Sequence, residues 1–162
     1  MLTLVAVVLS IVLIGITIYN FESYSLKEID FTLETLEDEN VSLSDYKGDL
    51  IFLNFWASWC EPCIEEMPAL MKINDTYIND GISVITVNRT MFEYNVENVH
   101  KFVDEQNISL PILLDKDNKV GEQYNVTEFP ATIVIDRNFE VDDIIMGEVT
   151  EQQLIDIISR YF

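Results

Sequence analysis

The sequence predicts an α/β sandwich in which helices flank a mixed central sheet. Three observations support this fold class. Nearly continuous apolar runs, typical of strands buried on both faces, occur in the middle of the chain. Segments with apolar residues at helical spacing alternate with those runs. The chain then ends with a strand pair and one more helix, which completes a mixed rather than a purely parallel sheet.

The first strands are expected to form an N-terminal hairpin. Residues 31–36 alternate apolar and polar side chains, and residues 41–43 begin a return strand after an acidic turn. Residues 50–55 are almost entirely apolar, which favours a central strand. The other expected strands are residues 82–87, 112–114, 131–135 and 141–146. The last two of these are expected to pair as a second hairpin.

Helices are expected between the strands. Their ranges are residues 61–79, 96–106, a helical turn at 120–124 and a last helix that opens at Thr150. Pro62 suits the first turn of the first helix, whereas Pro68 should kink it. Thr150 and Gln153 have the spacing of a capping box, so the start of the last helix is well marked.

The composition excludes several classes of function. Asp and Glu number 29 against 9 Lys and Arg, and the resulting net charge of −20 repels the phosphates of nucleic acids. With only two cysteines and one histidine, the chain holds neither a multi-disulfide scaffold nor a zinc site of four cysteines or of two cysteines and two histidines. A hydrophobic content of 49% excludes disorder of the whole chain.

The N-terminus carries a hydrophobic segment. Residues 1–21 have no charged side chain and are long enough to span a hydrocarbon core of about 30 Å as a helix. A cleaved signal peptide is an alternative, but the segment lacks a basic start and a small-residue cleavage site. A lipoprotein signal would need a cysteine near its end, and this segment has none. We expect an uncleaved membrane anchor at 1–20, a linker at 21–29 and an exported domain at 30–162.

The candidate chemistry lies in the pair Cys60 and Cys63, where a buried strand should end and a helix begin. Unpaired amides and a partial positive charge at a helix N-terminus stabilise a thiolate, which makes Cys60 the expected nucleophile and Cys63 the resolving thiol. Two alternatives to a redox role exist for this pair: it could be half of a zinc site, or it could be chemically inert. Haem attachment is excluded because Ile64 stands where that motif requires histidine.

Two segments resemble the thioredoxin superfamily. Residues 56–63, Trp-Ala-Ser-Trp-Cys-Glu-Pro-Cys, are similar to its active-site segment, and residues 128–132, Glu-Phe-Pro-Ala-Thr, are similar to its cis-proline loop. The Glu-Met-Pro at 66–68, the N-terminal hairpin and the Tyr-Asn-Val at 124–126 narrow the resemblance to the membrane-anchored TlpA/ResA group. It covers residues 30–162 and implies a thioredoxin-like fold with an N-terminal β-hairpin extension.

The resemblance also implies a set of substrate-contacting residues. Pro130 corresponds to the cis-proline, and the Phe129 backbone would pair with substrate like a strand. Trp59, beside the nucleophile, is either a substrate platform or a packing residue. Glu61 and Pro62, between the cysteines, complete the expected substrate-binding set. The charge of Glu61 opposes thiolate formation and should favour a reducing couple.

Proton exchange needs a further group. Cytosolic thioredoxins place a buried aspartate six residues before the first cysteine, where this chain has Asn54, which cannot titrate. Glu66 lies three residues past Cys63 on the same helical side and is the expected third catalytic residue. The alternative is a solvated helix carboxylate, as expected for Glu65.

The sequence thus predicts a membrane-tethered thiol-disulfide oxidoreductase that acts outside the cytoplasm and needs no cofactor or metal. The resemblance implies reduction of disulfides in exported proteins such as apocytochrome c, with electrons from a CcdA-type or DsbD-like membrane partner. Two alternatives stay open: a disulfide oxidase or isomerase, and a binding or chaperone module that uses the same groove without redox chemistry.

Overall fold

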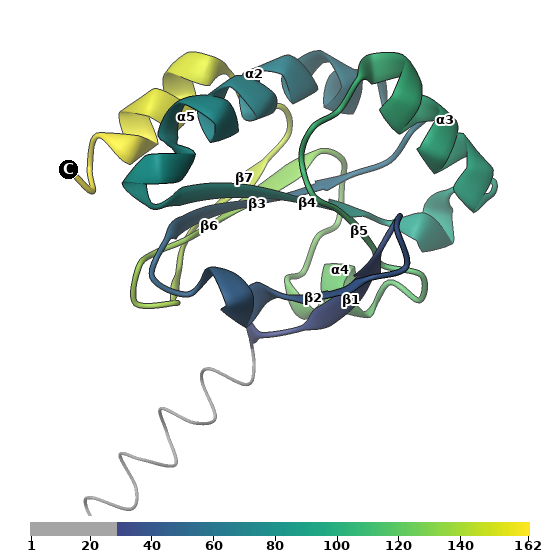
Figure 1. The fold of residues 1–162 in the computed structure, drawn as a ribbon, viewed down its shortest axis with the longest axis horizontal. Coiled ribbons are helices and arrows are strands. Elements are labelled where there is room, and N and C mark those ends of the chain that lie inside the picture. Colours follow the sequence, from purple (N-terminus) through teal and green to yellow (C-terminus); the bar gives the residue numbers. More distant parts are fainter. Residues whose placement is uncertain (1–28) are drawn as a thin grey trace, which may run out of the picture.

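The centre of the fold is the strand β3, Leu50–Trp56, in which every residue is buried. A strand with apolar side chains on both faces must be shielded from water on both faces, by helices or other elements packed against the sheet. The computed structural model, which describes residues 29–162, provides helices above and below it (Figure 1). β3 pairs in parallel with β4, Ile82–Asn88, and antiparallel with β6, Ala131–Ile135. The mixed sheet predicted from the sequence is confirmed.

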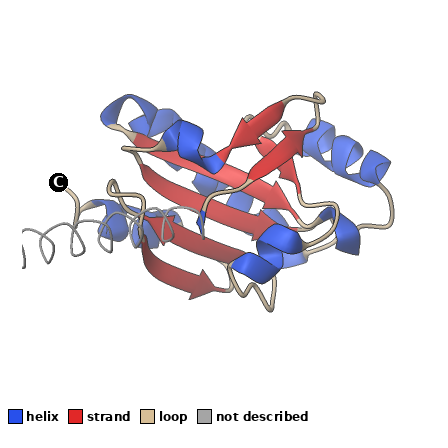
Figure 2. Ribbon diagram, turned by 90° about the horizontal axis from the view of Figure 1, so that it is seen from below, coloured by secondary structure: helices blue, strands red, loops and turns tan. Residues whose placement is uncertain are grey.

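The strands, drawn red in Figure 2, form one sheet. It has seven strands in the order β2-β1-β5-β4-β3-β6-β7. The remaining strands are β1 at Thr32–Thr35, β2 at Asn40–Ser42, β5 at Ile112–Leu114 and β7 at Val141–Met146. Both predicted hairpins are present, because β1–β2 and β6–β7 pair antiparallel. β1 also pairs antiparallel with β5, so the N-terminal hairpin extends the same sheet.

The helices form two layers (Figure 1). One face of the sheet carries α2 at Glu61–Tyr77, α3 at Val96–Gln106 and α5 at Glu151–Ile158. The other carries α4 at Lys119–Gln123 and a 3-10 turn, η1, at Leu43–Tyr46. The side chains of β3 alternate between the two cores, since strand residues point to opposite faces in turn. Asn54 therefore shares the α2 face with Phe52 and Trp56.

The topology brings several loops to one edge of the sheet. The parallel strands β3, β4 and β5 end there, at Trp56, Asn88 and Leu114. The antiparallel strand β6 begins there, opposite the end of β3. Loops that follow parallel strands at one edge are the usual place for a functional site in an α/β sheet. This edge holds the cysteine pair.

Some boundaries differ from the sequence prediction. Leu43 is fully buried but opens η1 rather than extending the second strand. α2 ends at Tyr77 rather than at residue 79, and a 3-10 turn leads to Gly81 with φ +74°; Ile78, in this turn, is exposed. Pro68 lies inside α2, which runs unbroken. The capping box of Thr150 with Gln153 is confirmed at the start of α5.

The predicted anchor at 1–20 and nearly all of the predicted linker at 21–29 lie outside the described residues. Within residues 29–162, no helix has the length and apolarity to cross a membrane.

Candidate functional site

Cys60 and Cys63 lie at the junction between β3 and α2. Cys60 is the N-cap of α2, and its sulfur accepts a hydrogen bond of 3.3 Å from the backbone N–H of Cys63. The two cysteines form a disulfide with their Cα atoms 5.3 Å apart. Cys60 is 5% exposed and Cys63 is fully buried. The helix N-terminus thus points its unpaired amides at Cys60, as the sequence predicted.

The segment before the cysteines is held by Glu93, which sequence reasoning missed. Its carboxylate accepts hydrogen bonds of 2.6 Å from both the backbone N–H and the hydroxyl of Ser58, and one of 2.7 Å from the Asn88 amide. These bonds tie the active-site segment to the end of β4. No local pattern marks Glu93, because its partners are as far as 35 residues away in the sequence.

Glu66 is buried rather than solvated, with 2% of its surface exposed. Its Oε1 accepts a hydrogen bond of 2.7 Å from the Asn54 amide, and its Oε2 accepts one of 2.8 Å from the Val149 N–H. Burial raises the pKa of Glu66 from 4.5 to about 7, although the two hydrogen bonds oppose this rise; the charge of Glu148 adds to it. Glu65 is exposed, as expected. Glu66 therefore has a pKa at which it exchanges protons near neutral pH.

Asn54 and Glu66 form a short polar network in the core between α2 and the sheet. The Asn54 amide also donates to the Thr132 hydroxyl, 3.1 Å away on β6. Asn54 Oδ1 is buried and has no hydrogen-bond partner. An unpaired buried acceptor is costly, because it loses its hydrogen bonds to water without gaining others. The network links the carboxylate to the strand that follows the proline loop.

The proline loop lies at the same edge. The Phe129–Pro130 peptide is cis, as the resemblance implied, and the Pro130 carbonyl accepts a hydrogen bond of 2.8 Å from Gly147. The Trp59 ring is 58% exposed and meets the Phe129 ring edge to face at 5.6 Å between centroids. The structure thus brings together residues that are 70 positions apart. Trp59 is both exposed and in contact with Phe129, so its predicted role as a substrate platform stays a prediction.

Phe92 is a second neighbour of Trp59 that sequence reasoning missed. Its carbonyl accepts a hydrogen bond of 3.0 Å from the Trp59 indole N–H, and its ring lies 5.9 Å from the Phe129 ring. Glu61 and Pro62 are exposed at the start of α2. Of the predicted substrate-binding residues, Trp59, Glu61 and Pro62 are thus exposed, Phe129 is half-buried and Pro130 is buried.

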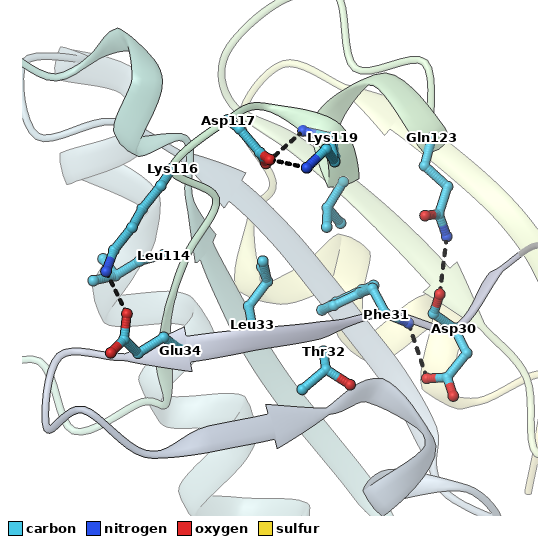
Figure 3. A pocket seen from close by; sticks show the side chains of 11 residues that line it. Asp30, Phe31, Thr32, Leu33, Glu34, Leu114, Lys116, Asp117, Lys119 and Gln123 are labelled. Carbon is cyan, nitrogen blue, oxygen red and sulfur yellow. Dashed lines mark hydrogen bonds and ion pairs between the residues drawn. The ribbon is translucent and has the colours of Figure 1, made fainter.

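A separate pocket of about 430 Å³ lies between β1 and the β5–α4 segment (Figure 3). Its two lysines are already paired, Lys116 with Glu34 and Lys119 with Asp117. None of its lining residues belongs to the cysteine or proline segments. In residues 29–162, no group of three or more candidate ligands is arranged to hold a metal ion.

Comparisons with known proteins agree with this geometry. The AhpC/TSA family matches residues 26–144. The thioredoxin-like protein YneN of Bacillus subtilis is 38% identical over 157 residues, which cover 91% of each chain. The thiol-disulfide oxidoreductase ResA of Geobacillus kaustophilus is 38% identical over 125 residues, covering 77% of this chain and 70% of ResA. The crystal structure of StoA from Bacillus subtilis is similar with a TM-score of 0.70 at 29% identity, covering 78% of this chain and 94% of StoA.

Proposed function

We propose a direction and a location for the reaction of this chain, which belongs to the AhpC/TSA family of thioredoxin-like proteins and is a thiol-disulfide oxidoreductase. The proposed function is reduction of disulfides in exported proteins, by a domain tethered to the outer face of the cell membrane. The observation that carries the direction is the pair of carboxylates on α2: Glu61 between the cysteines and the buried Glu66 one turn after Cys63.

The proposed reaction starts from the reduced protein. The Cys60 thiolate attacks one sulfur of the substrate disulfide, and the other substrate sulfur leaves as a thiolate and takes up a proton. Cys63 then loses its proton and attacks Cys60 in the mixed disulfide, which releases the second substrate thiol. The substrate gains two electrons, and the cysteine pair becomes the disulfide seen in the structure.

Glu66 is proposed to handle the proton of Cys63. A general base works best when its pKa lies near the ambient pH, because both of its protonation states are then available. The pKa of Glu66 is about 7, and its place on the same side of α2 as Cys63 suits this role. Asn54 and the Val149 N–H hold both carboxylate oxygens, so these two residues are positioning residues for Glu66.

The carboxylates favour reduction over oxidation of substrates. A negative charge near a thiolate destabilises it, raises the thiol pKa and so destabilises the reduced form of the pair. DsbA, whose reduced form is stabilised, illustrates the opposite case of a strong oxidant. We therefore expect a reduction potential nearer to that of thioredoxin, about −270 mV, than to that of protein disulfide isomerase, about −180 mV. Equilibration of the reduced protein with glutathione buffers measures it, and a value above that of the isomerase would indicate an oxidase or isomerase instead.

The location is proposed from the N-terminal segment. Residues 1–21 lack charge over a length that spans a bilayer, and the acidic remainder would be the exported part. A reductant outside the cytoplasm needs electrons from inside, and a CcdA-type or DsbD-like membrane protein is the proposed donor. Apocytochrome c is the proposed example among its exported substrates. Loss of reduced cysteines in exported apocytochrome c on deletion of this chain would support the substrate assignment.

Removal of residues 1–20 should give a soluble, folded and redox-active domain. The reason is that the core clusters and the cysteine pair all lie within residues 29–162. Gel filtration and an insulin-reduction assay measure the outcome, and the full chain in detergent is the control. Aggregation of the fragment, or loss of its disulfide reductase activity, would mean that the N-terminal segment is part of the domain rather than a tether.

A further inference from the structure

Arg89 is a buried cation beside the redox site, and the reaction described above does not use it. It follows β4 directly, and only 5% of its surface is exposed. Its backbone N–H donates to the Trp56 carbonyl at the end of β3, with a length of 3.0 Å. Arginine is rarely buried unless it is paired. The contacts of Arg89 therefore indicate its role.

The guanidinium is fixed by the two loops that flank α4. Its Nε donates to the Asn118 side chain at 2.7 Å and its Nη1 donates to the Val126 carbonyl at 2.9 Å. The buried Asp115 adds an attractive charge. Gly121 leaves the necessary room, because a Cβ there would come within 2.7 Å of the Arg89 Nε. These contacts hold the planar group in one orientation.

Two aromatic rings contact this group. The guanidinium carbon lies 4.6 Å from the centroid of the Phe92 ring and 4.8 Å from that of the Phe129 ring. Both distances are within the range of attractive cation–π contacts, which are strongest where the cation is desolvated. Phe129 in turn meets Trp59. We call Trp59, Phe92 and Phe129 the ring surface.

The ring surface is built from three segments at the site edge. Its members come from the cysteine segment, the β4–α3 loop and the proline loop. Trp59 is 58% exposed and Phe92 is 45% exposed, so the outer faces of these rings are available to a partner. Arg89 contacts two of the rings from within, and it holds the chain just before the proline loop through the Val126 carbonyl.

We propose that Arg89 is a positioning residue that holds Phe92 and Phe129 in place as part of the surface on which the protein substrate docks. The occupant is an apolar side chain in the segment that flanks the substrate cysteine, because the exposed faces of the rings are apolar. This inference rests on the proposed function, since it concerns protein disulfides as substrates. Arg89 itself touches neither the cysteines nor the substrate.

The test compares a protein disulfide with a small one. Arg89→Met keeps an unbranched apolar side chain but removes the guanidinium, with its charge, its hydrogen bonds and its contacts with the two rings. It should raise the KM for insulin about tenfold, the effect of losing one strong docking contact, with little change in kcat. Reduction of hydroxyethyl disulfide, which is too small to span the ring surface, should stay within about twofold of wild type, and so should the equilibrium constant with glutathione.

Arg137→Met is the matched control. Arg137 also stacks on an aromatic ring, that of Phe162 at 4.8 Å, but it lies in the β6–β7 turn. This variant should reduce insulin and hydroxyethyl disulfide as wild type does. Phe92→Ala removes a ring that is 45% exposed and keeps all the hydrogen bonds of Arg89, so it should reproduce the insulin defect even if Arg89→Met proves unstable. The double variant of Arg89 and Phe92 should be no worse than the more severe single variant.

The outcomes separate this inference from the proposed function. Equal losses with insulin and hydroxyethyl disulfide, or normal insulin kinetics in both Arg89→Met and Phe92→Ala, would overturn the role of Arg89. A wild-type protein that reduces neither substrate would overturn the proposed reductase function instead. In that case, oxidation of reduced insulin chains by the disulfide form tests the ring surface, because docking serves both directions of exchange.

Discussion

Replacing Cys60 by serine should abolish disulfide reduction, whereas replacing Cys63 should trap the protein in mixed disulfides with its substrates. The physical reason is the position of the two residues on α2. Cys60 is the N-cap, where the helix amides and dipole stabilise a thiolate. Cys63 is fully buried within the first turn and can act only after a substrate is attached to Cys60. Non-reducing electrophoresis of both variants, after incubation with a disulfide-containing protein, measures the adducts.

Alkylation of the reduced wild-type protein checks the same assignment without substitution. Cys60 should react with iodoacetamide faster than Cys63, because only Cys60 has surface exposed, 5% even in the disulfide form. Peptide mass spectrometry at short reaction times gives the order of labelling. Faster labelling of Cys63, or adducts that accumulate in Cys60→Ser rather than in Cys63→Ser, would reverse the two roles. Retained activity in the double serine variant would favour a binding module without redox chemistry.

The parts of the site that were predicted from the sequence are those with a local signal. Cys60 and Cys63 have a fixed spacing at the end of an apolar run, and a strand buried on both faces is recognisable from composition alone. Glu66 was predicted because helical spacing places it on the side of Cys63. Its two hydrogen-bond partners were not predicted, since Val149 is 83 residues away and Asn54 was considered only for its inability to titrate.

The parts that were missed depend on contacts between distant loops. Glu93 looks like one of many acidic residues in a chain of net charge −20, yet it holds Ser58 by two hydrogen bonds. Arg89 looks like a surface cation at a strand end, yet it is buried under Phe92 and Phe129. Neither residue lies in a motif, and only the parallel order of β3, β4 and β5 brings their loops to one edge.

Replacing Glu66 by glutamine should lower the apparent pKa values of the cysteine thiols, make the couple less reducing and slow reduction of a protein disulfide by roughly a hundredfold or more. Glutamine keeps the shape and removes both the charge and the exchangeable proton. Its amide can still be accommodated if the Asn54 amide rotates, which presents the unpaired Oδ1 of Asn54 to the new donor. Absorbance of the thiolates against pH gives the titration, whose apparent pKa values belong to the coupled group of Glu66 and the two thiols.

Glu65→Gln is the control for this effect, because Glu65 is exposed on the same helix. It changes the net charge by the same amount without touching the buried network. Its thiol pKa values and turnover should stay close to those of wild type. Equal and small effects of the two substitutions would make Glu66 an ordinary helix carboxylate with no part in proton exchange.

The raised pKa of Glu66 also predicts how stability depends on pH. In the unfolded chain the carboxyl ionises near pH 4.5, whereas in the folded, disulfide-bonded protein it ionises near pH 7. Between these values the unfolded chain releases a proton that the folded protein keeps. The free energy of unfolding therefore falls as the pH rises through this window, by roughly 3 kcal/mol from this group, and changes no further above it. Below pH 4.5 both states are protonated and the contribution is absent.

Glu66→Gln isolates this term from the repulsion among the other acidic residues, which weakens the folded state of both proteins alike as the pH rises. The free energy of unfolding of the variant minus that of wild type should increase by roughly 3 kcal/mol as the pH rises from 4 to 8. Urea unfolding of the oxidised proteins at a series of pH values measures this difference, and Glu65→Gln should show none of it. A difference between wild type and Glu66→Gln that is constant across this range would mean that Glu66 ionises in the folded protein as it does in the unfolded chain. The carboxyl would then be charged at neutral pH, and the proposed proton exchange with Cys63 would lose its basis.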